Sequence, residues 1–195
     1  TDADYITAWR QMQTIFDAPI EVVAVGEVWT FQPRDVGRWL TLHQPSAGQP
    51  ASLTIDESWV GAVVDEIALE IDRMPRSPRL WWNEAGQLVK TEDGRDGQTL
   101  QQADAENWLK IVFLGQDATN RAELPVVIDK LPPLPTDLST LGIAYPLAEA
   151  TTPYGGSLPE RMHNIELAAS RLNGTLIMPG QTFSFNAEVG HTTVE

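Results

Sequence analysis

The sequence predicts an α+β fold in which antiparallel hairpins pack with about four helices. Two patterns point to this class. Pairs of β-rich runs are separated by short turn segments, and apolar residues recur at three-to-four-residue spacing between those pairs. The composition is that of an ordinary globular chain, with 42% hydrophobic and 21% charged residues, so a core can be buried.

The first predicted elements are a helix, a hairpin and a second helix. Residues 4–17 carry four large apolar side chains at helical spacing. The β-rich runs 20–26 and 27–32 are expected to form the first hairpin. A short helix begins at Pro33, and a Pro/Gly/Ser-rich loop covers 45–51.

A short strand and the clearest helical pattern follow. We expect the strand at 53–55, and Thr54-Ile-Asp-Glu57 has the spacing of a capping box. The helix then runs to about Asp72. Its apolar stripe consists of Val60, Val63, Val64, Ile67, Ala68 and Ile71.

A second hairpin and another helix complete this part of the chain. The hairpin is predicted from the runs 79–83 and 87–91. Residues 99–102 can cap a helix that ends at Gly115, and 124–128 reads as a strand. The side chains expected to face inward on this helix are Ala105, Trp108, Leu109 and Val112.

A proline-rich run at 131–135 predicts a stiff linker. All seven tryptophans precede it, and this shift in composition favours two domains. We therefore divide the chain into a domain at 1–130, a linker at 131–140 and a second domain at 141–195.

The region after the linker predicts one helix and two strands. Ser157-Leu-Pro-Glu160 resembles a capping box, and the helix runs to about Leu172. Strands are expected at 175–178 and 182–186, and no closing element precedes Glu195, so we predict a truncated domain. The residues expected to face inward on the helix are Met162, Ile165, Ala168, Ala169 and Leu172.

The charge and the absence of cysteine exclude several functions. A net charge of -14 repels nucleic acid and disfavours electrostatic docking on an anionic membrane. With no cysteine, the chain has no disulfide, thiol nucleophile or thiolate metal site. No apolar run is long enough to span a bilayer. We therefore expect any membrane attachment to come from an anchor upstream of Thr1.

The region 140–195 resembles the opening of the VanW family. Its pattern is a helix, an Asn-Gly stop, a Pro-Gly turn and a Phe-Ser-Phe-Asn strand, in the family's order. The matching residues are Thr151-Thr152-Pro153-Tyr154, Arg161-Met162-His163-Asn164-Ile165, Leu167-Ala168-Ala169, Leu172-Asn173-Gly174, Pro179-Gly180-Gln181-Thr182-Phe183-Ser184-Phe185-Asn186 and Val189-Gly190. Family members continue into a Gly-rich stretch with a Cys-Gln pair, and they are associated with glycopeptide-resistance gene clusters.

Residues 20–130 are similar to the peptidoglycan-binding domain that often precedes VanW domains and some L,D-transpeptidase domains. The hairpin–helix pattern, a Gly97-Gln98-Thr99-Leu100 segment opening a helix and the strand before the prolines carry this likeness. The resemblance implies a cell-envelope protein outside the cytoplasmic membrane, anchored or secreted.

Tryptophans on the hairpins are the candidate glycan-binding residues, because sugars stack their apolar faces on aromatic rings. These are Trp29, Trp81 and Trp82. Neighbours in a strand point to opposite faces, so at most one of Trp81 and Trp82 enters a given core. The remaining tryptophans lie on predicted helices, where core packing is the expected role: Trp9, Trp39, Trp59 and Trp108.

Three polar residues of the VanW-like helix are the other candidates for binding: Arg161, His163 and Asn164. They either build part of a site or make ordinary ion pairs and backbone hydrogen bonds. No motif indicates a catalytic residue, a metal site or a cofactor, and Ser157 is explained by helix capping.

The leading hypothesis is a non-catalytic module that binds the glycan or stem peptide of peptidoglycan. One alternative is a structural spacer or protein-interaction platform that presents the VanW domain. Another is part of a wall-modifying enzyme whose active site lies beyond residue 195. The fragment itself is predicted not to be an enzyme.

Overall fold

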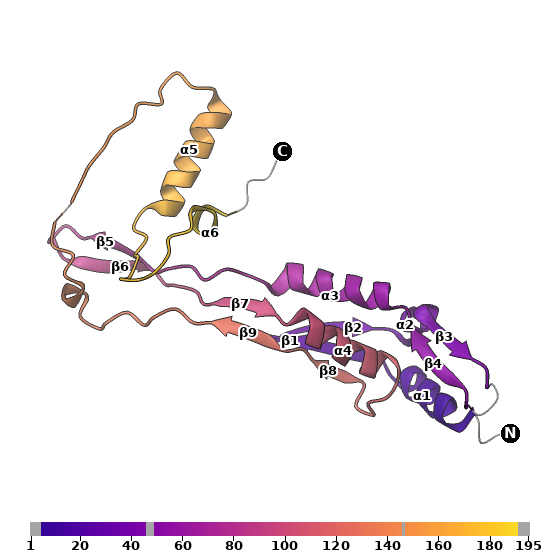
Figure 1. The fold of residues 1–195 in the computed structure, drawn as a ribbon. Helices are drawn as coiled ribbons and strands as arrows, with labels where there is room; N and C mark the ends of the chain where they lie inside the picture. Colours follow the sequence, from indigo (N-terminus) through magenta and orange to yellow (C-terminus); the bar gives the residue numbers. More distant parts are fainter. Residues whose placement is uncertain (1–4, 46–48, 146, 191–195) are drawn as a thin grey trace. The chain divides into compact units, whose positions relative to one another are not determined.

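The computed structural model describes residues 5–45, 49–145 and 147–190. Their contacts define two compact units, each built from two stretches of chain. The first unit takes the residues up to Arg73 together with Gln98–Ile128. The second takes Met74–Gly97 and the residues from Asp129 onward. Helices and small, mainly antiparallel sheets confirm the α+β class (Figure 1).

A three-stranded sheet in the first unit has the strand order β2–β1–β8. β1 (Ile20–Ala24) and β2 (Glu27–Phe31) form the predicted antiparallel hairpin. Its turn places Val25 and Gly26 at positive φ, 51° and 89°, as a tight hairpin turn requires. β8 (Arg121–Glu123) pairs with β1 in parallel, which a strand prediction at 124–128 did not include.

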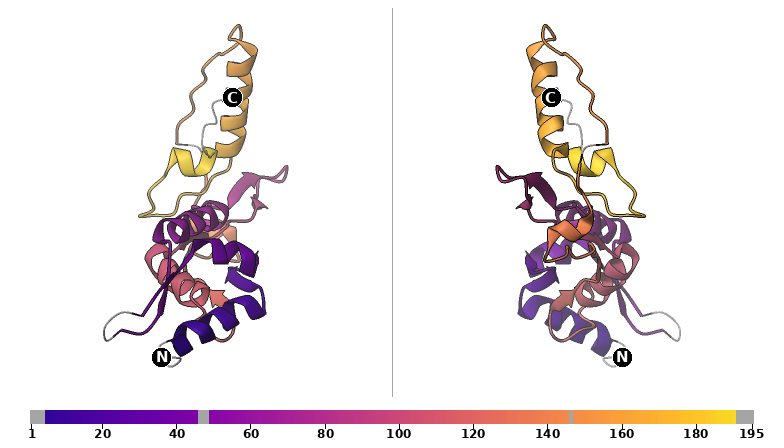
Figure 2. Two further views of the ribbon diagram at one scale, coloured as in Figure 1. Left: turned by 90° about the vertical axis from the view of Figure 1, so that its right-hand side faces the viewer. Right: turned by 90° about the vertical axis from the view of Figure 1, so that its left-hand side faces the viewer.

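The helices of this unit are α1 (Ile6–Asp17), α2 (Pro33–Val36), the 3₁₀ turn η2 (Gly37–Trp39), α3 (Glu57–Ile71) and α4 (Gln102–Phe113). All four α-helices were expected near these positions. α3 and α4 contact each other. Figure 2 gives two further views of the ribbon. The six residues of the predicted stripe are the buried residues of α3.

The core of the first unit joins the inner faces of these helices to β1. Buried Phe113 belongs to this core, and the partly buried rings of Phe31 and Trp59 pack against it. Phe113 is fully buried, and its ring centroid lies 5.1 Å from that of Phe31 and 5.0 Å from that of Trp59. Such close, inclined ring pairs add to the free energy gained from burial.

Two buried amides satisfy helix ends in the first unit. The Nδ2 of Asn120 donates to the carbonyls of Thr14 at 2.9 Å and Ala18 at 3.3 Å, at the end of α1. The Nε2 of Gln98 donates to the carbonyl of Ile71 at 2.6 Å, at the end of α3. The last carbonyls of a helix lack partners within it, so these contacts remove a cost of burial.

A hairpin in the first unit was not predicted. It pairs β3 (Leu40–His43) with β4 (Ser52–Ile55) in antiparallel register. The capping-box prediction at Thr54 was wrong, because Asp56 is the N-cap of α3. Its Oδ1 accepts from the backbone N–H groups of Ser58 at 2.9 Å and Trp59 at 3.2 Å. Hydrogen bonds from the Ser58 hydroxyl and these N–H groups lower the pKa of Asp56 below its ordinary 3.8.

The start of α4 also differs from the prediction. The segment Gly97–Leu100 is a strand, β7, not the opening of a helix, and it pairs with β9 (Val126–Asp129). The helix begins at Gln102 without a side-chain cap. Its predicted inward residues Ala105, Leu109 and Val112 are buried, but Trp108 is exposed.

The second unit contains the other predicted hairpin and the VanW-like helix. The hairpin pairs β5 (Arg79–Trp82) with β6 (Leu88–Glu92), and a 3₁₀ turn, η3 (Leu138–Leu141), contacts β6. The long helix is α5 (Pro159–Leu172). The short α6 (Phe185–Val189) lies beside its C-terminal end (Figure 1).

Three local predictions for this unit were wrong. The N-cap of α5 is Leu158 without a side-chain hydrogen bond, so Ser157 does not cap it. Residues 175–178 make only an isolated bridge, Thr175 to Arg79. The expected strand 182–186 is instead a loop followed by α6. Ser184 is the N-cap of this helix, and its Oγ accepts a hydrogen bond from the backbone N–H of Ala187 at 3.3 Å.

The apolar side of α5 is only partly covered. Of its predicted inward residues, Ala169 is exposed and the other four are half-buried, and the described helix has no fully buried residue. Across the described ranges, no helix combines the length and hydropathy that a bilayer span needs.

Candidate functional site

The hairpin of β5 and β6 presents two adjacent indole rings. Trp81 pairs with Val89 and Trp82 with Leu88, so the two tryptophans point to opposite faces of the ribbon. Trp81 is 52% exposed and Trp82 41%, so neither is sealed in a core. Both rings are accessible, which agrees with the expectation that at most one of them enters a given core.

Trp82 lines an open groove of about 700 Å³ within the second unit. Hairpin residues form one wall, and the segment 136–144 around η3 forms the other. The side chains that combine an aromatic ring, apolar surface and polar groups there are Trp82, Gln87, Leu88, Lys90, Asp137 and Ile143. A concave surface of this mixed character can bind a sugar ring, with hydroxyls paired at its edges.

The polar groups of the groove are held by local contacts. Lys90 forms an ion pair with Asp93. Asp137 Oδ1 accepts from the backbone N–H of Ser139 at 3.0 Å. Hydrogen bonds from the Ser139 hydroxyl and backbone lower the pKa of Asp137 below its ordinary 3.8. At neutral pH the groove therefore carries a lysine and a carboxylate, which favours an uncharged, hydroxyl-rich ligand over a strongly charged one.

Buried Arg79 fixes this hairpin to the end of α5. Its Nη1 donates to the carbonyls of Ser170 at 2.7 Å and Asn173 at 3.2 Å, and its Nη2 donates to that of Arg171. Its Nε lies 3.2 Å from Glu92 Oε2, an ion pair without hydrogen-bond alignment. A cation at the C-terminus of a helix is also favoured by the helix dipole.

Backbone contacts add to this attachment. The N–H of Leu80 donates to the carbonyl of Gly174 at 2.8 Å, and that of Leu176 donates to Pro78 at 3.3 Å. Gly174 has φ +74°, and a Cβ there would lie 2.6 Å from the Leu80 carbonyl oxygen. The two tryptophans therefore stand on a ribbon that is hydrogen-bonded to the VanW-like segment. Sequence analysis missed Arg79, because a single arginine in a strand gives no signal of its helix partner.

Trp29 belongs to the first unit and is half-buried. Its Nε1 donates to Glu70 Oε2 at 2.9 Å, and its ring packs against the core. This hydrogen bond links β2 to α3. Trp29 therefore has a structural role, and a glycan-binding role for it stays a prediction.

The tryptophans assigned to helix cores are mostly exposed. Trp9 is 59% and Trp108 45% exposed, so core packing was the wrong expectation for both. Trp39 is 42% exposed but stacks on half-buried Trp59, with ring centroids 5.7 Å apart and an interplanar angle of 10°. Apolar spacing identified these helices but extended their buried faces too far, to Trp9 and Trp108.

Arg161, His163 and Asn164 are all exposed on α5. Their side chains make no hydrogen bond or ion pair with another residue in the part of the chain that the structure describes. Arg161 is therefore exposed, as one expectation had it, whereas the backbone contacts expected of His163 and Asn164 are not formed there. Arg161 and Asn164 share a helix face, since they are three residues apart, and His163 points elsewhere. Their role in binding stays a prediction.

The described residues were also examined for groups of side chains that could bind a metal ion. No group of three or more His, Asp or Glu residues there is placed to hold a metal ion. The structure therefore defines an α+β protein whose candidate site is an exposed aromatic ribbon beside a groove.

Residues 160–195 match the family model described as VanW like protein. This match confirms the VanW resemblance over α5, α6 and the loop between them. The match does not extend over the tryptophan hairpin. No curated protein matches the sequence.

Two solved structures share a remote likeness with the chain. They are the carbamoyl enzyme formed by Ldtfm with avibactam and a cysteine-to-serine mutant of the Enterococcus faecium L,D-transpeptidase. Each is 16% identical, with a TM-score of 0.39 over 61% of this chain. The aligned part spans 44% and 45% of those chains, less than half of their length. A likeness at this TM-score defines neither fold nor function.

Proposed function

We propose that this chain is a non-catalytic, cell-wall-related module that recognises peptidoglycan outside the cytoplasmic membrane. The observation that carries the proposal is the pair of exposed indoles on the β5–β6 hairpin, one of which lines a groove. The glycan is the proposed ligand of Trp82, and a stem peptide is the second ligand that the same surface could contact.

The hairpin suits a binding role because it is fixed before the ligand arrives. Arg79 and two backbone hydrogen bonds hold the strand that carries both tryptophans. A fixed ring loses little conformational freedom on binding, and each aromatic contact then contributes more to affinity. Stacking also needs no charge, which matters for a chain with a net charge of -14.

Co-sedimentation with purified sacculi tests the proposal. We expect the chain to sediment with them, and Trp82→Ala to weaken binding several-fold to about tenfold. Trp108→Ala is the matched control, because Trp108 is similarly exposed at 45% but lies on α4 in the first unit. Binding should fall only slightly with added salt, since stacking and neutral hydrogen bonds are weakly screened.

Two results would count against this function. One is an absence of sedimentation at both low and moderate salt. The other is equal loss of binding in Trp82→Ala and Trp108→Ala, which would indicate non-specific adhesion. Trp81→Ala, on the opposite face of the ribbon, then reports whether one or both faces contact the wall.

A protein-interaction platform is the second candidate function, and α1 favours it. This helix buries Ala8 and Ile15 but leaves Trp9 and Phe16 59% and 55% exposed. Exposed apolar side chains in one region are typical of protein contact surfaces. If Trp9→Ala abolishes binding of a protein partner while sacculus binding is unchanged, α1 is the protein-interaction surface.

A further inference from the structure

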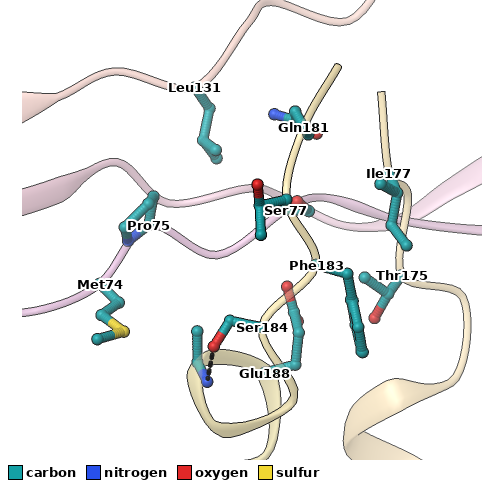
Figure 3. A pocket seen from close by; sticks show the side chains of 12 residues that line it. Met74, Pro75, Ser77, Leu131, Thr175, Ile177, Gln181, Phe183, Ser184 and Glu188 are labelled. Carbon is teal, nitrogen blue, oxygen red and sulfur yellow. Dashed lines mark hydrogen bonds between the residues drawn. The ribbon is translucent and has the colours of Figure 1, made fainter. Parts of the chain in front are cut away.

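A second, smaller cavity of about 230 Å³ lies within the second unit (Figure 3). Its lining comes from residues near Met74, from Leu131 and from the loop and helix between Thr175 and Glu188. In the view of Figure 3, the ring of Phe183 lies between the side chains of Thr175 and Glu188. Most of the lining therefore belongs to the VanW-like segment.

Two polar atoms of this lining are shielded from solvent and have no hydrogen-bond partner. They are the hydroxyl oxygen of Thr175 and Oε2 of Glu188. A shielded carboxylate oxygen without a donor is costly, more so than a neutral group. The cost is removed if a ligand brings donors to these atoms.

The charge and shape of the lining select the ligand. Glu188 is the one ionisable residue among the lining residues of the described chain, so the cavity favours a cation. Ile177 and Phe183 supply apolar surface for an alkyl arm, and an aromatic ring attracts an ammonium group over its face. Since a water occupies about 30 Å³ in the liquid, the cavity has room for one small organic group.

We propose that this cavity binds a primary ammonium at the end of an alkyl arm, such as a lysine side chain of a peptide. The ammonium donates to Glu188 Oε2, and the arm lies against Phe183, whose ring separates Glu188 from Thr175. This site is separate from the tryptophan groove, and its ligand does not depend on whether the groove binds glycan.

Titration with n-butylammonium, followed by amide NMR shifts of the whole chain, tests this site. We expect saturable shifts at Thr175, Phe183 and Glu188, and much weaker ones with 1-butanol, an uncharged probe of the same length. Glu188→Gln keeps the side-chain shape and removes the charge, so the ammonium should bind about tenfold more weakly. Thr175→Val removes the hydroxyl on the other side of the Phe183 ring and should change ammonium binding less than Glu188→Gln does.

Glu160→Gln is the matched control, because Glu160 is an exposed carboxylate in the first turn of α5 and does not line the cavity. Unchanged binding in this variant is expected. The proposal is overturned if butylammonium and butanol shift the same amides equally, or if Glu188→Gln binds like the original chain with its fold intact by circular dichroism. Trp82→Ala should keep ammonium binding, so failure here and failure of wall recognition are distinguishable.

Discussion

The contacts inside the first unit differ in kind from the contacts inside the second unit. In the first, apolar side chains from four α-helices and β1 form a continuous core that includes Phe113 and against which Phe31 and Trp59 pack. In the second, Leu80 and Leu176 are the only fully buried apolar side chains among the described residues. Its elements are joined mainly by Arg79 and by backbone hydrogen bonds.

This difference separates stability from binding. Burial of apolar surface is non-directional and contributes most of the folding free energy. Polar contacts depend on geometry, so they fix orientation with a smaller net contribution. The first unit is therefore expected to tolerate changes on the surface, whereas the second should respond to the loss of single polar contacts.

The largest expected effect tests the core of the first unit. Phe113→Ala removes a fully buried ring and should lower the free energy of unfolding by about 3–5 kcal/mol. Urea unfolding measures the loss, and hydrogen exchange assigns it to first-unit peptides. Ile111→Ala, on an exposed position of the same helix, should change little. A loss below about 1 kcal/mol would mean that this core is not the main source of stability.

The next effect tests the polar attachment in the second unit. Arg79→Met leaves the carbonyls of Ser170, Arg171 and Asn173 without their donor and should cost about 2–3 kcal/mol. Hydrogen exchange should accelerate in α5 and the hairpin, with first-unit peptides unchanged. Arg161→Met removes an exposed arginine of α5 and serves as the control. Equal exchange in both variants would refute the anchoring role.

A smaller effect concerns the close approach of two backbones. Gly174→Ala places a Cβ 2.6 Å from the Leu80 oxygen at φ +74°, whereas Gly180→Ala has φ +84° and open space. Both variants bear the strain of positive φ, about 1–2 kcal/mol. Thermal unfolding should show a larger loss of stability in Gly174→Ala than in Gly180→Ala. The difference between the two variants measures the contact between the hairpin and the loop. Identical losses would show that this contact is easily rearranged.

The smallest effect is pH-dependent and lies in the first unit. The pKa of Asp56 is lowered in the folded chain, so its stabilisation is present above about pH 3.8 and is lost as the pH falls through the folded value. Asp56→Ala should lower the melting temperature by a few degrees at pH 7, and this difference from the original chain should shrink progressively as the pH is lowered below 3.8. Glu66→Ala, on the exposed side of the same helix, should not show that pH dependence.

Long or paired patterns in the sequence identified their elements correctly. The stripe of α3 predicted six buried residues because a long amphipathic helix repeats its pattern over several turns. Both predicted hairpins formed, since each pairs two β-rich runs across a short turn. These elements are specified by residues that are near each other in the chain.

The elements that were missed depend on distant partners. β7 and β3 have four residues each, too few to show a periodic pattern, and they are strands because β9 and β4 lie beside them. Phe183 and Phe185 alternate as in a strand, yet Ser184 caps α6 between them. The candidate site followed the same rule. Trp81 and Trp82 were identified as candidates, but the groove beside Trp82 requires the segment 136–144, and the attachment of their strand requires Arg79.

The second unit is built from two separate stretches of the chain. Residues 74–97, which include the hairpin, precede the last stretch of the first unit, and α5 follows it. A gene fragment that begins at the proline-rich run would encode α5 without Arg79, which donates hydrogen bonds to the carbonyls at the end of this helix. Such a fragment would leave these groups to water and remove the Pro78 carbonyl that accepts from the Leu176 N–H. Transplanting the VanW-like segment into another protein therefore requires two inserts, one of them the tryptophan ribbon.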